Sequence, residues 1–236
     1  MEQAIIINRT EDLKYWSKKY TRIYFGNEFC PRLFPDKKEI DAVVKFVKDR
    51  ELKLTLLTSW ADSESLSSMK KAIKYVMSKK ILDEIVVNDY GMINYLNRQY
   101  PLCKIILGRA IALFIPSLSA DNFFYKMGIR RIEYNDLEII KLLSRKVAGP
   151  KISYYYPYSV ISASRYCPVA NIFQNKSRNH GIIKCFKECL PIKELKVRSS
   201  IFFKPAILKG NAQLMKNKIN LKALEKTCID RLVFQP

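Results

Sequence analysis

The chain has 236 residues, of which 48% are hydrophobic, and it carries a formal net charge of +20 at pH 7. This length and hydrophobic content exclude a disordered polypeptide and allow one large buried core. The chain has no run of about eighteen uncharged apolar residues, and its first residues lack the basic segment and cleavage site of a signal peptide. We therefore expect a cytoplasmic protein without a transmembrane segment.

The positive charge is unevenly distributed. Residues 141–236 contain 19 Lys or Arg against 4 Asp or Glu, whereas residues 1–140 contain 23 against 18. Clustered cations favour an anionic partner such as RNA, an acidic protein or a membrane surface. A lysine-rich solvated surface is the alternative, and composition alone does not separate the two.

Short apolar runs alternate with amphipathic runs along the chain, which is typical of βα units around a parallel sheet. The predicted strands span residues 4–8, 22–26, 53–59, 84–89, 104–110, 129–135, 151–157 and 230–236. Helices are predicted from Thr10 and over residues 36–51, 65–80, 92–100, 136–149 and 221–229. The helix over 36–51, for example, carries Ile40, Val43, Val44 and Val47 on one face.

This pattern predicts a single α/β domain over residues 1–236 with a (β/α) TIM-barrel-like fold, and a doubly wound open sheet is the alternative. No helix is predicted after the last strand, so the prediction leaves open whether the barrel is complete. A cysteine-bearing loop and a short hairpin form an insertion at about residues 159–218, after the seventh strand. The hairpin is expected over residues 200–210, with its turn near Lys204 and Pro205.

Three of the six cysteines, Cys167, Cys185 and Cys189, lie close together in the sequence, and Cys30 follows the second predicted strand. In a parallel βα protein the carboxyl ends of the strands meet at one face. We therefore expect these four thiols to gather there. Thiolate ligands select zinc, copper(I) or an iron–sulfur cluster over harder cations.

Among these metals the spacing favours a [4Fe–4S] cluster. Structural zinc sites usually have closely spaced cysteine pairs on both sides, and only Cys185 and Cys189 form such a pair here. The alternative is that the cysteines are unrelated structural residues. Cys103, which precedes the fifth strand on the opposite face, and Cys228, in a late helix, are predicted to be small buried hydrophobic residues.

Two polar residues at predicted strand ends are candidate catalytic groups. Arg109 could pair with a substrate carboxylate through its planar guanidinium, and Asp89 could orient the substrate or transfer a proton. The alternative for each is a helix cap or a surface ion pair. Further polar residues are expected at the same rim: Glu28, Asp62, Asn135 and Tyr156.

Tyrosines are frequent in the seventh predicted strand, at 154–156, and Tyr158 follows it. They could stack on bases or on an aromatic ring. Strand alternation instead favours packing of Tyr155 in one layer and of its neighbours in another.

Several segments resemble, in order, the collagenase-like peptidase U family, from about Arg22 to the C-terminus. They are IYFGNEFCPR, EIVVNDYGMINYLNRQYP, KIILGRA, MGIRRIEYN, SRYCP and the closing C-x(3)-C pair. The resemblance is greatest to the UbiV-type members, which pair with UbiU in oxygen-independent ubiquinone biosynthesis. It implies a barrel-like fold, a UbiU-like homologous subunit as partner, and hydroxylation of an aromatic substrate without dioxygen, with prephenate as the oxygen donor. It also implies a [4Fe–4S] cluster held by Cys30, Cys167, Cys185 and Cys189.

Three other functions remain open at this stage. Related members hydroxylate a pyrimidine in RNA, and the basic C-terminal region is compatible with an RNA-modifying or RNA-binding relative. A cluster-bearing scaffold without activity of its own is another alternative. A peptidase is the least favoured, because the chain has a single histidine, His180, and neither a G-x-S-x-G nor an H-E-x-x-H motif.

Overall fold

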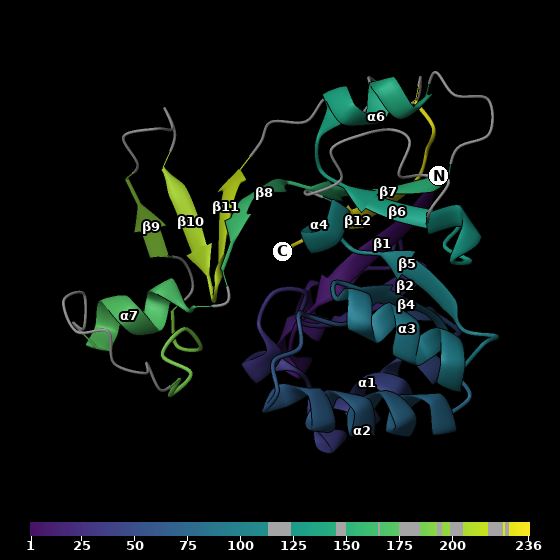
Figure 1. Ribbon diagram of the computed structural model, residues 1–236, viewed down its shortest axis with the longest axis horizontal. Coiled ribbons are helices and arrows are strands. Elements are labelled where there is room, and N and C mark those ends of the chain that lie inside the picture. The colour runs from purple at the N-terminus through teal and green to yellow at the C-terminus, as the bar shows by residue number, and fades with distance from the viewer. Residues whose placement is uncertain are drawn as a thin grey trace.

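The computed structural model of the protein describes residues 1–112, 124–144, 150–164, 166–174, 185–192, 195–198, 205–216, 224 and 227–236. Within these ranges, parallel strands form a closed barrel in the order β1–β12–β7–β6–β5–β4–β3–β2 (Figure 1). The barrel strands are β1 (Glu2–Ile7), β2 (Arg22–Gly26), β3 (Lys53–Leu57), β4 (Leu82–Val87), β5 (Lys104–Leu107), β6 (Arg131–Tyr134), β7 (Lys151–Tyr156) and β12 (Ile229–Phe234). Strand β12 closes the ring by pairing with both β1 and β7. The predicted TIM-barrel-like α/β fold is therefore confirmed, and the barrel is complete.

Side chains alternate between the inside and the outside of the barrel, as the strand period of two requires. Inward-facing apolar residues form a small central cluster: Ala4, Ile6, Tyr24, Leu57, Val86, Ile106, Tyr155 and Val233. The alternate residues, such as Ile5, Ile23 and Tyr154, belong to the larger core between the strands and the helices. The predicted separation of Tyr155 from its neighbours is confirmed.

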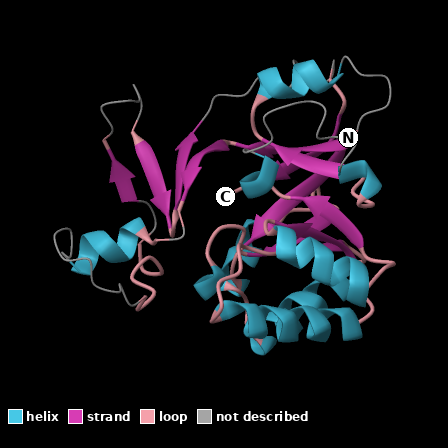
Figure 2. Cartoon of the chain, in the orientation of Figure 1, coloured by secondary structure: helices cyan, strands magenta, loops and turns pink. Residues whose placement is uncertain are grey.

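Helices cover the outside of the strands (Figure 2). They are α1 (Lys37–Lys48), α2 (Ser65–Ser78), α3 (Tyr90–Gln99), α4 (Arg109–Ala112) and α6 (Leu137–Ser144), with short 3₁₀ helices η1 (Thr10–Tyr15) and η2 (Pro31–Leu33). Helix α1 begins at a capping box, in which Asp36 accepts a hydrogen bond from the Glu39 N–H and Glu39 accepts one from the Asp36 N–H. No helix in the described ranges is long and apolar enough to cross a membrane.

A second, antiparallel sheet stands beside the barrel (Figures 1 and 2). Its strands are β8 (Tyr158–Ala163), β9 (Leu195–Val197), β10 (Ala206–Lys209) and β11 (Ala212–Lys216), in the order β8–β11–β10–β9. Helix α7 (Pro168–Gln174) follows β8. Apolar residues of this sheet, including Val160 and Ile207, pack in one cluster with Phe29 and Ala110 of the barrel loops. This cluster fixes the sheet against the carboxyl-terminal mouth of the barrel.

One local prediction differs from the structure, and two fall largely outside the described residues. The first half of the hairpin expected over residues 200–210, including Lys204 of its turn, lies outside the described ranges; within them, a tight turn at Gly210 joins β10 to β11, and Gly210 has a φ of +60°, which favours glycine. The helix predicted from Thr10 is the 3₁₀ helix η1. The predicted helix 221–229 lies mostly outside the described residues, and its last residue already belongs to β12.

Candidate functional site

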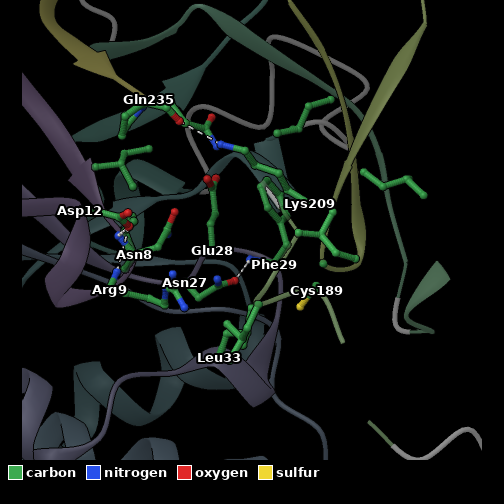
Figure 3. A pocket seen from close by; sticks show the side chains of 18 of the residues that line it. Asn8, Arg9, Asp12, Asn27, Glu28, Phe29, Leu33, Cys189, Lys209 and Gln235 are labelled. Atoms are coloured by element: carbon green, nitrogen blue, oxygen red, sulfur yellow. Dashed lines mark hydrogen bonds between the residues drawn. The ribbon is translucent and has the colours of Figure 1, made fainter. Parts of the chain in front are cut away.

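A cavity of about 580 Å³ lies between the mouth of the barrel and the antiparallel sheet. Figure 3 shows Asn27, Glu28 and Gln235 on the barrel side of this cavity and Lys209 on the sheet side. Cys189, from the segment that follows α7, also lines it. The volume is in the usual range for a small-molecule site, and such sites in barrel enzymes lie at the carboxyl-terminal face.

Glu28 lines the floor of the cavity, and it forms a buried ion pair with Arg109 directly beneath the lining. Arg109 donates from Nε to both carboxylate oxygens of Glu28 at 3.1 Å, and from Nη2 to Oε2 at 2.6 Å. Both side chains are almost completely buried. Burial alone would lower the pKa of Arg109, but the charge and hydrogen bonds of Glu28 raise it above its usual value. The pair with Glu28 therefore keeps Arg109 positively charged.

Arg109 is placed by the junction between β5 and α4. A Cβ atom at Gly108 would lie only 2.3 Å from Oδ1 of Asn88, so only glycine fits there. The same Asn88 donates to the Thr58 carbonyl and accepts from the Ala110 N–H. These contacts fix the first turn of α4 and hold the Arg109 side chain inside the barrel mouth.

Cys30 lies on the loop that follows β2. Its N–H donates to Oδ1 of Asn27 at 2.8 Å, and Pro31 then begins η2. The Leu33 N–H donates to the Cys30 carbonyl at 3.2 Å, and the backbone N–H groups of Arg32 and Leu33 lower the pKa of the Cys30 thiol. The Cys30 side chain is buried, on the side of the barrel mouth that faces the antiparallel sheet, where Gly210 lies next to it.

The three late cysteines lie on the segment that extends from the antiparallel sheet. Cys167 immediately precedes α7, and its sulfur accepts a hydrogen bond from the Ala170 N–H at 3.4 Å. Cys185 and Cys189 flank a turn in which the Leu190 N–H donates to the Lys187 carbonyl at 2.9 Å. None of the six cysteines forms a disulfide.

The four predicted ligands are close enough to influence one another electrostatically. Burial is the main cause that raises the pKa of Cys30 to about 11, and the nearby thiols of Cys185 and Cys189 contribute to this increase. Burial likewise raises the pKa values of Cys167 and Cys189, and Cys185 contributes to both shifts. Ionised thiols at these positions would repel one another, and a bound cation would remove that repulsion.

The donor set fits a soft metal centre in its chemistry, because four thiols from two remote chain segments share one region. Within the described ranges, however, no three Cys, His, Asp or Glu side chains converge closely enough to hold a metal ion as they stand. The prediction that the cysteines gather is supported by their electrostatic coupling, and their ligation of a metal stays a prediction.

Asp89 caps helix α3. Its Oδ1 accepts from the Met92 N–H at 3.0 Å, and its Oδ2 lies 3.5 Å from the Ala61 nitrogen. Asp89 is therefore a helix cap, which was the expected alternative to a catalytic role. Neither an ion pair nor a hydrogen bond links Asp89 to Arg109 among the described contacts, so the structure does not bring the two candidate catalytic residues into one contact.

The other residues predicted at the rim divide into two groups. Glu28 and Asn135 are buried, whereas Asp62 and Tyr156 are partly exposed. Asp62 accepts hydrogen bonds from Ser65 at the start of α2 and pairs with Arg32 at 3.3 Å. Only Glu28 of these residues lines the cavity.

The two cysteines that were not predicted as ligands differ from each other. Cys103 packs against the barrel core just before β5, at the end opposite the mouth, and burial raises its pKa to about 11. Cys228 is exposed and directly precedes β12. The prediction of a buried hydrophobic residue in a helix is therefore wrong for Cys228, because the chain enters the last strand at Ile229.

The sequence did not predict the pairing of Arg109 with Glu28 or the burial of the Glu133 side chain. Arg131 and Glu133 are two positions apart in β6, so their side chains point to the same face of the strand, which is the interior of the closed barrel. Two charged residues at this spacing in a predicted barrel strand were the available signal. The histidine at position 180 lies outside the described residues.

The chain is thus a parallel βα barrel with a cavity at its carboxyl-terminal mouth and a cysteine-bearing segment beside that cavity. The sequence model of Peptidase family U32 matches residues 14–200. The chain therefore belongs to peptidase family U32, which confirms the resemblance to the peptidase U family. No curated protein matches the chain.

Among solved structures, the U32 peptidase Mk0906 is similar over 100% of this chain and 92% of its own, with a TM-score of 0.59 and 13% sequence identity. At this identity the likeness bears on the fold alone. A member of the enolase superfamily from Listeria innocua is 17% identical, with coverage of 96% of this chain and 62% of that one. Its TM-score of 0.39 is too low to support an argument.

Proposed function

We propose that this U32 family member holds a [4Fe–4S] cluster through Cys30, Cys167, Cys185 and Cys189. We further propose that, like the UbiV-type members, it takes part in an oxygen-independent hydroxylation of a ubiquinone precursor or related aromatic substrate, together with a UbiU-like homologous subunit. The observation that carries the proposal is that Cys185 and Cys189 lie near enough to Cys30, on a remote segment, to raise its pKa, and that Cys189 lines the cavity. Ligation requires that the segments that carry the cysteines move closer together, because no three of the described side chains converge as they stand.

The cavity beside these thiols is the proposed substrate site. A bound cluster would supply one-electron redox chemistry there. Cys189 lines the cavity, so a molecule bound in it lies next to one of the proposed ligands. Roles of Asp89 and Arg109 in the reaction stay predictions. Their contacts favour positioning, because Asp89 caps a helix and the guanidinium of Arg109 is occupied by Glu28.

RNA is a second candidate substrate, and exposed aromatic side chains near the cysteines favour it. Tyr166 is 79% exposed, Phe186 is 72% exposed, and Lys187 beside Phe186 is also exposed. Aromatic rings next to cations are the groups on which unpaired bases stack. Retention of single-stranded RNA that weakens steeply with rising salt would favour this candidate. Retention that is absent at low salt would contradict it.

The experiment that tests the proposed reaction uses the chain co-expressed with a homologous U32 subunit and purified without oxygen. We expect the two chains to co-purify, and we expect the reconstituted complex to hydroxylate a ubiquinone precursor in the absence of dioxygen when prephenate is supplied. Oxygen-18 labelling of water and of dioxygen should leave the product unlabelled. A product that takes its oxygen from dioxygen, or hydrolysis of peptides by the complex, would contradict the proposal.

A further inference from the structure

Glu133 lies inside the barrel beneath the cavity floor. It points inward from β6 and has an exposed fraction of 0%. Its Oε2 accepts a hydrogen bond from the hydroxyl of Tyr155, whereas its Oε1 has no hydrogen-bond partner among the residues that the structure describes. A buried carboxylate with an unpaired oxygen is costly, so this position selects against the ionised side chain.

The cations nearest to Glu133 are engaged by other carboxylates. Arg109 on the mouth side pairs with Glu28. Arg231 of β12, on the opposite side, pairs with Glu2 and Glu84. Neither guanidinium donates a hydrogen bond to Glu133 among the described contacts, so each attracts Glu133 only from a distance.

The charged and titratable groups that face Glu133 can be compared by their effect on its ionisation. Burial and the charge of Glu28 raise the pKa of Glu133, whereas Tyr155, Arg109 and Arg231 lower it, and the result is a pKa of about 8. Tyr24 of β2 also faces Tyr155, edge to face at 6.0 Å, and burial raises its pKa. At pH 7 this corresponds to roughly ten protonated side chains for each ionised one.

Tyr155 connects Glu133 to the cavity floor. The guanidinium carbon of Arg109 lies 3.8 Å from the centre of the Tyr155 ring, in a cation–π contact, while the hydroxyl at the far end of the ring reaches Glu133. The orientation of the Tyr155 ring is therefore fixed at its hydroxyl by Glu133 and on its face by Arg109. Movement of Glu133 would move the surface on which Arg109 rests.

We propose that Glu133 is a proton-carrying positioning residue of the cavity: as a neutral acid it fixes Tyr155 under Arg109 and leaves Glu28 as the carboxylate that pairs with the guanidinium. Ionisation of Glu133 would place a second carboxylate near one guanidinium and would draw Arg109 away from Glu28. The carboxylate of Glu28 would then lose its fixed place in the cavity lining. This inference concerns the cavity alone and does not require that the cysteines bind a cluster.

Infrared difference spectroscopy of the full chain between pH 6 and pH 9 tests the protonation state. We expect the carbonyl band of a protonated carboxylic acid near neutral pH, with a midpoint near pH 8, and its absence from Glu133→Gln. Tyr155→Phe should move the midpoint upward, because the Tyr155 hydroxyl stabilises the ionised form. A wild-type protein in which no such band titrates above pH 6, or a band that persists in Glu133→Gln, would overturn the proposal.

Positioning is tested separately by the nitrogen-15 NMR signal of Arg109 Nε–H, assigned by its loss in Arg109→Lys. In the wild type this signal should shift with the same midpoint as the infrared band. In Glu133→Gln, which keeps the shape of the neutral acid, it should stay at its low-pH position throughout. A purely structural role for Glu133 predicts no titration of Arg109 in the wild type, and that result overturns the positioning role. Equal titration in both proteins does the same.

Discussion

Buried charges are compensated differently at the two ends of the barrel interior. At the amino-terminal end, Arg22 donates to Glu2 and Thr55, and Arg231 donates to Glu2 and Glu84. Burial raises the pKa of Glu84, but hydrogen bonds and charge from Arg231 outweigh this effect and lower it overall. Arginines and carboxylates thus compensate one another at this end.

At the carboxyl-terminal end, one buried carboxylate is not compensated in this way. Arg109 pairs with Glu28, while one oxygen of Glu133 has no hydrogen-bond partner within the described ranges. The cysteine thiols beyond the floor also have pKa values raised by burial and by one another. The amino-terminal end is therefore built for stability, whereas the mouth has acidic groups that would be stabilised by an additional proton or cation. This difference is the physical reason for placing function at the mouth.

The largest effect is expected from removing a predicted cluster ligand. Cys30→Ala and Cys185→Ala should each abolish the visible chromophore of the anaerobically reconstituted protein, because a [4Fe–4S] cluster needs its thiolate ligands. Cys103→Ala is the matched control, since Cys103 is half-buried at the opposite end of the barrel, and it should keep the chromophore. Equal loss in all three variants would remove the ligand assignment.

The amino-terminal network should respond to the loss of one cation by a large loss of stability. Arg231→Met leaves Glu2 and Glu84 without a main partner, and we expect it to lower the free energy of unfolding by about 3–5 kcal/mol. Chemical denaturation measures this change. Lys141→Met, which removes the exposed pair with Glu138, is the control and should cost less than about 1 kcal/mol. If both variants lowered the free energy of unfolding by a similar amount, the proposed compensation of charge at the amino-terminal end would be contradicted.

The mouth should instead show a pH dependence opposite in sign to that of the amino-terminal network, in which the arginines lower the pKa of Glu84. The pKa of Glu133 is about 8 in the folded protein and about 4.3 in unfolded chains, so the folded state holds an extra proton between these values. The free energy of unfolding should therefore fall as pH rises from about 5 to about 8, by up to about 1.4 kcal/mol per pH unit from this group.

Glu133→Gln has no proton to lose, so its stability should decline less steeply over the same range. Denaturant titrations of both proteins at several pH values measure the difference between the two slopes. Parallel slopes would mean that Glu133 is ionised in the folded protein at neutral pH.

The smallest effect is expected at Asp89, where capping and catalysis can be separated. Asp89→Ala should lower the free energy of unfolding by about 1 kcal/mol, because the Met92 N–H loses its acceptor. Asp89→Asn keeps the cap and should change stability by only a few tenths of a kcal/mol. If the asparagine variant keeps its stability but loses the hydroxylation, Asp89 acts through its charge and not only as a cap.

The sequence predicted the barrel because each strand and helix carries its own local pattern, as in Ile40, Val43, Val44 and Val47 of α1. It also predicted that Cys30 and the late cysteines share one end, because parallel strands bring their carboxyl ends together. The antiparallel sheet was predicted only as a loop and a hairpin, because β8 pairs with β11 across a long intervening segment and the strands are too short to leave a periodic signal.

The partners of individual side chains in the site were also beyond the sequence. Arg109 and Glu28 are 81 positions apart, and their pairing depends on the exact closure of the barrel. The sequence identified both as rim residues but could not show that the two side chains form an ion pair with each other. Glu133 was missed because a charged residue in a strand is usually read as exposed.

The central claim is that four thiols at the barrel mouth hold one iron–sulfur cluster, and metal analysis tests it most directly. Iron and acid-labile sulfide should be measured per chain after anaerobic reconstitution and desalting. The account predicts about four iron and about four sulfide per chain, as a [4Fe–4S] cluster requires. A protein that stays colourless with neither element bound, or that holds one zinc ion in their place, would contradict it.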